Sequence, residues 1–347
     1  MSGGTDSSVA AILLQDAGYE VVGVTFRFYE KDNCTEYLDD ARELCGRLGI
    51  QHIVSDQRER FKTTIIDYFI SEYMSGHTPV PCTLCNNYLK WPLLRQIADE
   101  IGIYYLATGH YVQKQLIDGH WHITNGADED KNQSFFLWGL PQDILERMVL
   151  PMGGLTKQRV REIAEERGFL KAAKKKDSLG VCFCPMDYRT FLRDKVSAEA
   201  IQKGKFVDAE GNFIAWHEGY PFYTIGQRKG LGIGGRKESL FIISTDVKEN
   251  VIYVGEGDSH PGLYRRALCI KPGEVHWVEP SEQMQVGERR RYQVRIRYRQ
   301  PLQKATLLQR EDGLYILFDE PQRGIAAGQF AAWYDGDNLV GSGVIEK

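Results

Sequence analysis

The first half of the chain alternates between two hydrophobic periods. Apolar residues recur at helical spacing over 9–19, 39–50 and 93–103, and runs rich in β-branched and aromatic residues lie at 20–29, 51–56 and 104–111. Strands that alternate with helices predict a parallel sheet with crossover helices. The pattern fades in a lysine-rich stretch before Asp177. We therefore predict an α/β domain over about residues 1–185.

The second half of the chain has a different pattern of glycines and apolar residues. Glycines become frequent from about Gly204, and short apolar runs follow at 221–226, 240–247 and 250–257. Clearer alternation then marks 291–298, 304–310, 313–320 and 330–346, with turn residues between the runs. Short strands at regular spacing predict a small, mostly β central domain over 186–264 and a C-terminal β-barrel over 265–347. Three domains suit a chain of 347 residues, because single cores seldom grow so large.

Composition places the chain among ordinary globular proteins, with 42% hydrophobic and 26% charged residues. No apolar run has the length of a membrane span and no signal peptide opens the chain, so a cytoplasmic protein is expected. An odd number of cysteines, seven, argues against a disulfide framework.

The net charge of −4 does not indicate a nucleic-acid partner, but basic residues are clustered. An acidic protein can still carry a basic binding face. Taken alone, each cluster is more simply explained as solvated surface. The clusters are Lys171 with Lys174, Lys175 and Lys176, and Arg289, Arg290, Arg291, Arg295, Arg297 and Arg299.

A phosphate-binding loop is the sharpest local signal. The run from Ser2 to Ser8 reads Ser-Gly-Gly-Thr-Asp-Ser-Ser and precedes a predicted helix. Glycines allow close backbone approach to a phosphate, and the hydroxyl and amide groups can face the anion. Asp6 suits a Mg²⁺ ion or the amides of the loop itself. The lysine of the G-x-x-x-x-G-K-[ST] motif is missing, so this is another kind of loop. The alternative is a chance match in a flexible N-terminus.

The position of this loop raises a difficulty. A phosphate loop should follow the first strand of its sheet, yet Met1 directly precedes Ser2. Either the start codon is placed too late or the sheet lacks a central strand. We favour the late start, because a missing central strand would leave strand edges unpaired.

Two cysteine contexts lie in predicted loops. Cys82-Thr83-Leu84-Cys85 follows Pro79 and Pro81, and Cys182 lies in the run 177–183. A thiolate is the working nucleophile, and the lysines upstream of Cys182 would favour it. Sulfur transfer needs one thiol to carry a persulfide and a second to resolve it, which suits Cys182 and Cys85.

Other interpretations of the cysteines remain. A thioredoxin-like role would place the C-x-x-C pair at the start of a helix after an early strand, a context not evident here. An iron–sulfur cluster on Cys82, Cys85 and Cys182 is a further, less favoured interpretation. We expect the remaining cysteines to be ordinary small buried residues. They are Cys34, Cys45, Cys184 and Cys269.

Taken together, these motifs resemble those of the tRNA-specific 2-thiouridylases over nearly the whole chain. Other ATP pyrophosphatases share only the phosphate loop. The markers are Ser2 to Ser8, Leu84-Cys85-Asn86, Ala107-Thr108-Gly109-His110-Tyr111, Lys174-Lys175-Lys176-Asp177-Ser178, Gly226-Gln227-Arg228-Lys229-Gly230-Leu231-Gly232-Ile233-Gly234-Gly235 and Arg297-Tyr298-Arg299-Gln300.

The resemblance implies a reaction. ATP would adenylate the C2 oxygen of the wobble uridine U34 of tRNA. A persulfide on Cys182 would deliver sulfur to C2, and Cys85 would complete the transfer as nucleophile while a transient Cys85–Cys182 disulfide forms. AMP and pyrophosphate would leave, and 2-thiouridine would be the product. Mg²⁺ would accompany ATP. The implied partners are tRNAs for Glu, Gln and Lys, and a cysteine desulfurase or sulfur-relay protein as persulfide donor.

The resemblance also implies binding residues. The ATP contacts it implies are Met1, Ser2, Gly3, Gly4, Thr5, Asp6, Ser7, Ser8, Phe26 and Gly109. The tRNA contacts it implies are Val80, Pro81, Cys82, His110, Lys131, Asn132, Gln133, Arg297, Tyr298, Arg299 and Gln329.

This chain departs from the family pattern at two positions. Many members carry Asn-Pro-Asp where Val80-Pro81-Cys82 stands, so any role of that aspartate is in doubt. Cys82 could replace it, carry sulfur or help to ligate a cluster. Many members also have Lys-Asp-Gln where this chain has Lys131-Asn132-Gln133.

Two other functions compete with thiolation. One is an enzyme with the same loop and another acceptor, such as an argininosuccinate synthetase or a different tRNA thiolase. The other is an RNA-binding protein with a decayed ATP site. The intact loop and the paired cysteine contexts favour the thiouridylase.

Overall fold

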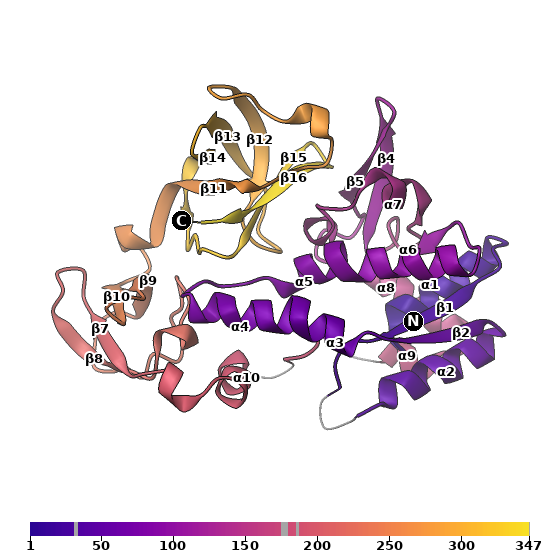
Figure 1. Cartoon of the computed structure of the whole chain (residues 1–347), viewed down its shortest axis with the longest axis horizontal. Coiled ribbons are helices and arrows are strands. Elements are labelled where there is room, and N and C mark those ends of the chain that lie inside the picture. The colour runs from indigo at the N-terminus through magenta and orange to yellow at the C-terminus, as the bar shows by residue number, and fades with distance from the viewer. Residues whose placement is uncertain (31–33, 175–179, 185–186, 347) are drawn as a thin grey trace. The chain divides into compact units, whose positions relative to one another are not determined.

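The computed structural model of the chain describes residues 1–30, 34–174, 180–184 and 187–346 (Figure 1). The chain forms two compact units. Unit 1 contains Met1–Ile66, Cys82–Pro185 and Asp335–Val340, and unit 2 contains Asp67–Pro81, Met186–Tyr334 and Gly341–Lys347.

Unit 1 is an α/β unit. Its first elements are α1 (Thr5–Asp16), β1 (Val22–Arg27), α2 (Glu36–Leu48), β2 (Gln51–Asp56), α3 (Arg58–Phe61) and the π-helix η2 (Lys62–Ile66). After the unit 2 segment follow the π-helix η3 (Cys85–Lys90), α6 (Trp91–Glu100), β3 (Leu106–Ala107), β4 (Val112–Ile117), β5 (His120–Asn125), η4 (Ser134–Phe136), α7 (Gln142–Arg147), β6 (Met148–Val149), α8 (Lys157–Glu166) and α9 (Leu170–Lys174). The short helix α5 (Pro81–Leu84) starts at the boundary residue Pro81.

Parallel strand pairing in unit 1 confirms the predicted fold class. β1 pairs with β2 in parallel, from Val22 opposite Gln51 to Arg27 opposite Asp56, and α2 connects the two strands. β3 pairs with β6 in parallel. Beside β1, the amino group of Met1 donates to the carbonyl oxygen of Val24. Four of the described strands of unit 1 therefore form two parallel pairs.

Two strand predictions in unit 1 need correction. The strand expected over 104–111 is reduced to Leu106–Ala107, because Thr108 onwards turns toward the phosphate loop. The hairpin of β4 and β5 was not predicted at all. Its signal was present, since Asp118 and Gly119 both adopt positive φ in the tight turn that an Asp-Gly pair favours.

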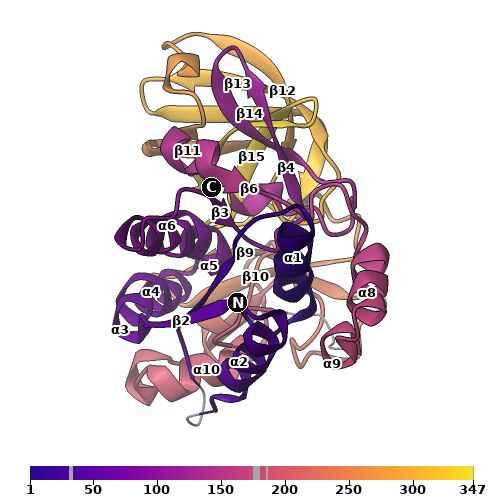
Figure 2. The same cartoon turned by 90° about the vertical axis from the view of Figure 1, so that its right-hand side faces the viewer.

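The core of unit 1 surrounds α1. Val9, Ala10 and Ile12 are buried against α8, where Val160 and Ala164 are fully buried. Figure 2 shows α1 beside α8 and α9, and these helices are in contact. Because α1 is apolar on most of its surface, its N-terminal loop is held by a buried element and not by an exposed one.

Unit 2 begins with α4 (Asp67–Met74) and continues with a small sheet. Its elements are α10 (Tyr188–Lys195), η5 (Ala198–Ala200), β7 (Gly204–Val207), β8 (Phe213–His217), η6 (Tyr220–Phe222), β9 (Leu240–Asp246), β10 (Val251–Glu256) and η7 (Pro261–Leu263). The sheet has the order β8-β7-β10-β9 and closes over Phe206, Ile242 and Ile252. The strand predicted over 221–226 is wrong. Pro221 has no backbone N–H for a ladder, and the segment turns as η6 instead.

A closed barrel makes up the rest of unit 2, except that Asp335–Val340, which include the start of β16, are counted with unit 1. Its elements are β11 (Tyr264–Trp277), η8 (Pro280–Glu282), β12 (Arg289–Arg295), β13 (Gln303–Arg310), β14 (Gly313–Arg323), β15 (Phe330–Asp335) and β16 (Asn338–Ile345). The strand order is β11-β14-β13-β12-β15-β16, and pairing of β11 with β16 closes the ring. The predicted barrel is therefore confirmed.

The longest barrel strand, β11, was not predicted. Its sequence is interrupted by Pro272 and Gly273, which normally break a strand. The structure accommodates them at a register shift between Ile270 and Val275, where the pairing with β16 is irregular. A β-bulge therefore lets one strand turn a corner of the barrel.

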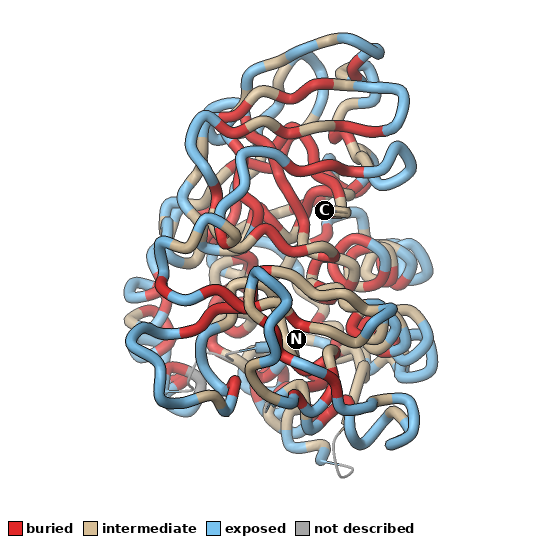
Figure 3. The backbone as a smooth tube through the Cα atoms, turned by 90° about the vertical axis from the view of Figure 1, so that its left-hand side faces the viewer, coloured by how far each residue is buried: buried red, intermediate tan, exposed pale blue. Residues whose placement is uncertain are grey.

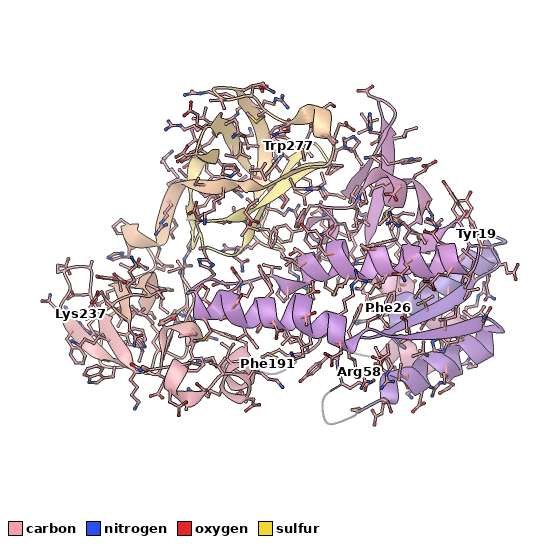
Figure 4. All side chains as sticks on the ribbon, viewed as in Figure 1. Tyr19, Phe26, Arg58, Phe191, Lys237 and Trp277 are labelled. Carbon is pink, nitrogen blue, oxygen red and sulfur yellow. The ribbon has the colours of Figure 1, made fainter. Side chains whose placement is uncertain are left out.

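Large aromatic side chains fill the barrel. Trp333, Tyr334 and Phe330 are buried, and Trp277 packs edge-on against Trp333 with ring centroids 5.1 Å apart. Figure 3 shows buried stretches along the strands and exposed residues at many turns, and Figure 4 labels Trp277. Burial of such side chains contributes roughly 2–3 kcal/mol each, which explains how so small a barrel is stable. Among the described residues, no helix is long and apolar enough to cross a membrane.

Candidate active site

The predicted phosphate loop is folded as a tight turn into α1. Gly3 has φ +63°, and a side chain there would meet Asp40 Cβ at 2.6 Å. Ser8 Oγ donates to the carbonyl oxygen of Gly4 at 2.7 Å, and Ser2 Oγ lies 3.1 Å from Ser7 Oγ. Glycine is required at position 3 both by the backbone and by the lack of space. The loop therefore has the close-packed backbone that the sequence predicted.

Asp6 is the focus of a polar cluster that the sequence did not reveal. Lys157 Nζ and the Tyr111 hydroxyl both donate to Asp6 Oδ1, each at 2.7 Å. Gly109 packs so closely that an added Cβ would lie 2.8 Å from the Asp6 carbonyl carbon. The predicted ATP residues Gly109 and Asp6 are thus neighbours. The glycine was predictable from its motif, but Lys157 carried no local signal.

The C-x-x-C segment is helical, so its prediction as a loop was wrong. α5, η3 and α6 follow one another without a break from Pro81 to Glu100. Proline is favoured at the first position of a helix, because its φ is already helical and its missing N–H costs nothing there. No strand directly precedes this helix, since α4 comes before it in the chain. A thioredoxin-like context is therefore not found among the described residues near Cys82.

The turns that follow α5 are wider than those of an α-helix. Residues Cys85–Lys90 form a π-helix, a rare element that often marks a functional site. Asn87 stabilises it, since its side-chain amide donates to the carbonyl oxygens of Thr83 at 2.7 Å and Phe136 at 3.0 Å. Its oxygen accepts from the Gly139 N–H at 2.9 Å. The wide turn is thus fastened to the 136–139 segment.

Cys182 lies in a short turn closed by an isolated bridge between Val181 and Cys184. Its predicted loop position holds for residues 180–184, and residues 177–179 lie outside the described part of the chain. Cys182 is exposed while Phe183 is buried, packing edge-on against Phe61 with centroids 5.7 Å apart. The buried phenylalanine therefore anchors a turn that presents a thiol.

An aromatic row joins this turn to the end of β1. Phe26 stacks on Phe28 at 5.2 Å, Phe28 stacks on Phe61 at 5.0 Å, and Phe61 contacts Phe183. Figure 4 labels Phe26 on β1 and Arg58 at the start of α3. Phe26, predicted to contact ATP, is thus linked by packing to the residue next to Cys182.

An electrostatic effect of Cys182 reaches the other two candidate thiols. Cys182 acts on both Cys82 and Cys85, although it is far from them in the sequence. Burial raises the pKa of the Cys82 thiol to about 11 and that of Cys85 to about 12. Burial also raises the pKa of Cys182, because protein atoms crowd its sulfur even though part of the side chain is exposed. Neutral thiols are therefore the resting forms at pH 7.

Lys90 is the cation that opposes this burial effect. It lowers the pKa values of Cys82, Cys85 and Cys182. We had expected the lysines at 174–176 to act on Cys182. Lys174 is exposed and is not among the groups that shift its pKa, while Lys175 and Lys176 lie outside the described residues. The sequence carried no signal for Lys90, which the structure places one π-helical turn after Cys85.

His110 is buried close to this cluster. Its ring stacks on Trp91 with centroids 6.1 Å apart, and Nδ1 lies 2.6 Å from Thr108 Oγ1. Burial, assisted by Lys90, lowers the pKa of His110 to about 3. The imidazole is therefore neutral, and its predicted contact with tRNA stays a prediction.

The Lys131-Asn132-Gln133 segment is held by its own side chains. Asn132 is buried and donates to Asn125 Oδ1 at 2.5 Å, and the Gln133 side-chain oxygen accepts from the Tyr111 N–H at 3.0 Å. Lys131 is half-buried. These bonds fix the segment beside the residues around Tyr111, and they do not test the predicted tRNA contacts.

The remaining predicted tRNA residues lie in unit 2, with Cys82 at the start of the next segment of unit 1. Gln329 donates to the carbonyl oxygen of Thr78 at 2.7 Å, which ties the barrel to the chain just before Val80 and the buried Pro81. Arg299 has φ +66° and lies over the Tyr298 ring at 5.3 Å. The structure thus gives Gln329 a structural contact that the sequence did not suggest.

The arginine cluster of the barrel is less basic than its sequence suggests. Arg290 pairs with Glu288 and Arg291 with Asp319, each at 2.6 Å, and Arg295 is buried over the Tyr334 ring. Arg297 instead lines a pocket of about 540 Å³ together with Arg228, Lys229 and Arg323. This pocket therefore gathers four basic side chains of unit 2.

The other cysteines largely follow expectation. Cys45, Cys184 and Cys269 are buried, whereas Cys34 is exposed, so its prediction as a buried residue was wrong. None of these cysteines, all of which lie in the described part of the chain, forms a disulfide bond. Within the described residues, no group of three histidine, cysteine or acidic side chains is placed to hold a metal ion.

Three protein-family models match successive parts of the chain. They are described as a tRNA methyl transferase HUP domain over residues 1–186, a tRNA methyl transferase PRC-barrel domain over 189–256 and an aminomethyltransferase beta-barrel domain over 267–345. Curated relatives are also similar over almost their whole length. The tRNA-specific 2-thiouridylase MnmA 2 of Phocaeicola vulgatus is 58% identical over 99% of this chain and 96% of its own. The tRNA-specific 2-thiouridylase MnmA 1 of Bacteroides fragilis is 53% identical over 99% of this chain and 95% of its own.

This chain belongs to the tRNA-specific 2-thiouridylase family. A more distant member, MnmA of Christiangramia forsetii, is 40% identical over 99% of this chain and 98% of its own. The resemblance inferred from the motifs is confirmed, and with it the assignment to a sulfur-transferring enzyme. The interpretations as an argininosuccinate synthetase or as a non-catalytic RNA-binding protein are not retained.

Proposed function

We propose that this thiouridylase uses ATP and Mg²⁺ to put sulfur on C2 of the wobble uridine U34 of tRNA, through a persulfide on Cys182. The observation that carries the proposal is the placement of Cys182 and Lys90 where their charges act on Cys85, in the same unit as the phosphate loop. Two thiols within the electrostatic reach of one cation suit a persulfide relay. The relatives' name supplies the product, 2-thiouridine.

In the first step, the C2 oxygen of uridine attacks the α-phosphorus of ATP. The bond to the β-phosphate oxygen breaks, and pyrophosphate leaves with its electron pair. Loop residues Ser2 to Ser8 suit the phosphates, and Asp6 suits Mg²⁺, which would neutralise phosphate charge. The uridine O2 thereby becomes part of AMP, a better leaving group.

In the second step, the outer sulfur of the Cys182 persulfide loses its proton and attacks C2. AMP then leaves with the electrons of the C2–O bond. The Cys85 thiolate attacks Sγ of Cys182, which forms the Cys85–Cys182 disulfide and releases 2-thiouridine. A dithiol reductant restores both cysteines, and a persulfide donor such as a cysteine desulfurase or relay protein reloads Cys182.

The substrate base must leave its stack to reach these groups. Phosphate contacts would come from basic side chains such as Arg297 and Arg299, and base contacts from the segment Val80-Pro81-Cys82 near the thiols. We propose tRNAs for Glu, Gln and Lys as the acceptors. Cys82 takes the place of the family's aspartate, and its thiol lies within electrostatic reach of Cys182.

A thiolation assay tests this function. Wild type and the Cys82→Ala, Cys85→Ala and Cys182→Ala variants are incubated with tRNA, Mg·ATP and a persulfide donor, and nucleosides are measured by mass spectrometry. We expect at least a 100-fold loss for Cys85 and Cys182, because each forms a covalent intermediate. Cys34→Ala, which removes an exposed thiol, and Cys45→Ala, which removes a buried one, are the matched controls.

The outcomes separate the interpretations. Full thiolation by Cys182→Ala would contradict the persulfide relay. The same samples, purified without oxygen, are analysed for iron. Stoichiometric iron that is lost with Cys82→Ala would favour a cluster on the three thiols over a persulfide on Cys182.

A further inference from the structure

Lys157 is a buried cation beside the phosphate loop. The residue is 8% exposed, and its Nζ donates to Asp6 Oδ1 at 2.7 Å. The same oxygen accepts from the Tyr111 hydroxyl. Lysine is seldom buried, because removal of its charge from water is costly even when it is paired. This burial therefore calls for an explanation beyond packing.

The position of Lys157 in its helix also fails to explain why its side chain is buried. It is the first residue of α8, where the helix dipole disfavours a positive charge. Its main-chain N–H donates to Asp128 Oδ2 at 2.8 Å, and Thr156 caps the helix by accepting from Arg159 N at 3.2 Å. The helix start is thus fixed by groups other than the lysine side chain. The ammonium is aimed at Asp6 without being needed to form α8.

The phosphate loop lacks a cation of its own. Between Ser2 and Ser8 the loop contains no lysine or arginine, and it carries the negative Asp6. In the G-x-x-x-x-G-K-[ST] loop, by contrast, a lysine reaches the outer phosphates. A triphosphate placed on this loop would therefore meet an uncompensated carboxylate unless another element supplied positive charge.

We infer that Lys157 is the phosphate-loop cation of this enzyme, supplied by α8, and that it binds the β- and γ-phosphates of ATP that leave as pyrophosphate. The inference rests on the proposed function, because it assigns a role within the ATP step. An ammonium has three N–H donors without a fixed geometry, so Nζ can share or exchange its bond to Asp6 with phosphate oxygens.

This arrangement has a chemical consequence. As the uridine oxygen bonds to the α-phosphorus, negative charge grows on the oxygen that bridges to the β-phosphate. A buried ammonium at that place stabilises the departing pyrophosphate. Lys157 also keeps the Asp6 carboxylate in position for Mg²⁺. The first role requires the β- and γ-phosphates, so it affects the binding of ATP and not that of AMP. The support of Asp6 does not require these phosphates.

A binding comparison of ATP and AMP tests the inference. Dissociation constants of Mg·ATP, AMP and inorganic pyrophosphate are measured by calorimetry with the full chain, for wild type and Lys157→Met. We expect Lys157→Met to weaken ATP and pyrophosphate binding about 10- to 100-fold, the effect of one lost charge-assisted hydrogen bond, and AMP binding less than about threefold. Release of pyrophosphate that depends on tRNA should fall at least as much as ATP affinity.

Two variants act as controls. Arg159→Gln removes a half-exposed positive charge from the same helix turn, where Arg159 pairs with Glu162 and Glu166, and should bind ATP as wild type does. Lys157→Arg keeps the charge and should retain the preference for ATP over AMP. If Lys157→Met does not fold, the Lys157→Arg variant still decides, since loss of the preference with the charge retained would overturn the inference.

The remaining outcomes are distinct. Equal weakening of ATP and AMP by Lys157→Met would reduce Lys157 to a support for Asp6 and would overturn the inference. Unchanged binding of both nucleotides would do the same. Absence of tRNA-dependent pyrophosphate release in the wild type would instead contradict the proposed function itself.

Discussion

At the scale of single residues, Lys90 connects the candidate chemistry. It lowers the pKa values of the three thiols and helps to lower that of His110. A positive charge stabilises a thiolate and destabilises an imidazolium. One half-buried lysine therefore favours anionic sulfur while His110 stays neutral.

Removal of Lys90 should make Cys182 less reactive. Because Lys90 lowers the thiol pKa, Lys90→Met should raise it further, and the thiolate fraction at any pH below that pKa should fall. A shift of one unit corresponds to about tenfold slower alkylation. The measurement is the rate of iodoacetamide modification of Cys182 from pH 7 to 9, followed by peptide mass spectrometry.

Lys174→Met is the matched control, because Lys174 is exposed and close to Cys182 in the sequence. Its alkylation rate should equal that of wild type. Slower alkylation of Cys182 in Lys174→Met, together with a wild-type rate in Lys90→Met, would support the expectation from the sequence that the upstream lysines activate this thiol.

At the scale of elements, the helix from Pro81 to Glu100 carries two thiols and Lys90. Its π-helical turn would be unfavourable alone, because π-helices rarely persist without external support. Asn87 supplies that support through the carbonyl groups of Thr83 and Phe136 and the N–H of Gly139. The π-helical conformation of this segment therefore depends on residues about 50 positions away in the chain.

Asn87→Ala should destabilise unit 1 by about 3 kcal/mol, since three buried hydrogen bonds are lost at about 1 kcal/mol each. Urea unfolding gives the change in the free energy of unfolding. Gln96→Ala, which removes an exposed amide from α6, should change it by less than about 0.5 kcal/mol. Equal stability of the two variants would show that Asn87 does not hold the π-helix.

At the scale of the whole molecule, the chain divides into two compact units. The phosphate loop, the three thiols, Lys90 and Lys157 belong to unit 1, and the pocket with Arg297 belongs to unit 2. Units with separate cores often unfold separately, so a single two-state transition is not expected.

Mg·ATP should therefore stabilise unit 1 selectively. At 100 times its dissociation constant, a ligand stabilises the folded unit by about 2.7 kcal/mol. Differential scanning calorimetry should show more than one transition, of which one moves to higher temperature with Mg·ATP and returns when EDTA removes Mg²⁺. Equal shifts of all transitions, or none, would argue against an ATP site confined to unit 1.

The sequence by itself determined the elements whose signals are local. β1, α1 and α2 follow directly from hydrophobic period, because each buries one face or run, and β2 was recognised although none of its residues is buried. The phosphate loop, Gly109 and both cysteine contexts were recognisable as short motifs. Family membership followed from those motifs and agrees with the relatives.

Only the tertiary structure decided features that depend on distant partners. The helical state of Cys82 and Cys85, the corner in β11 at Pro272 and the burial of Arg295 all depend on residues far away in the chain. Lys157 and Lys90 have no motif of their own, and their importance comes from the charges they meet in space. Electrostatic interaction depends on distance and burial, which a one-dimensional pattern does not contain.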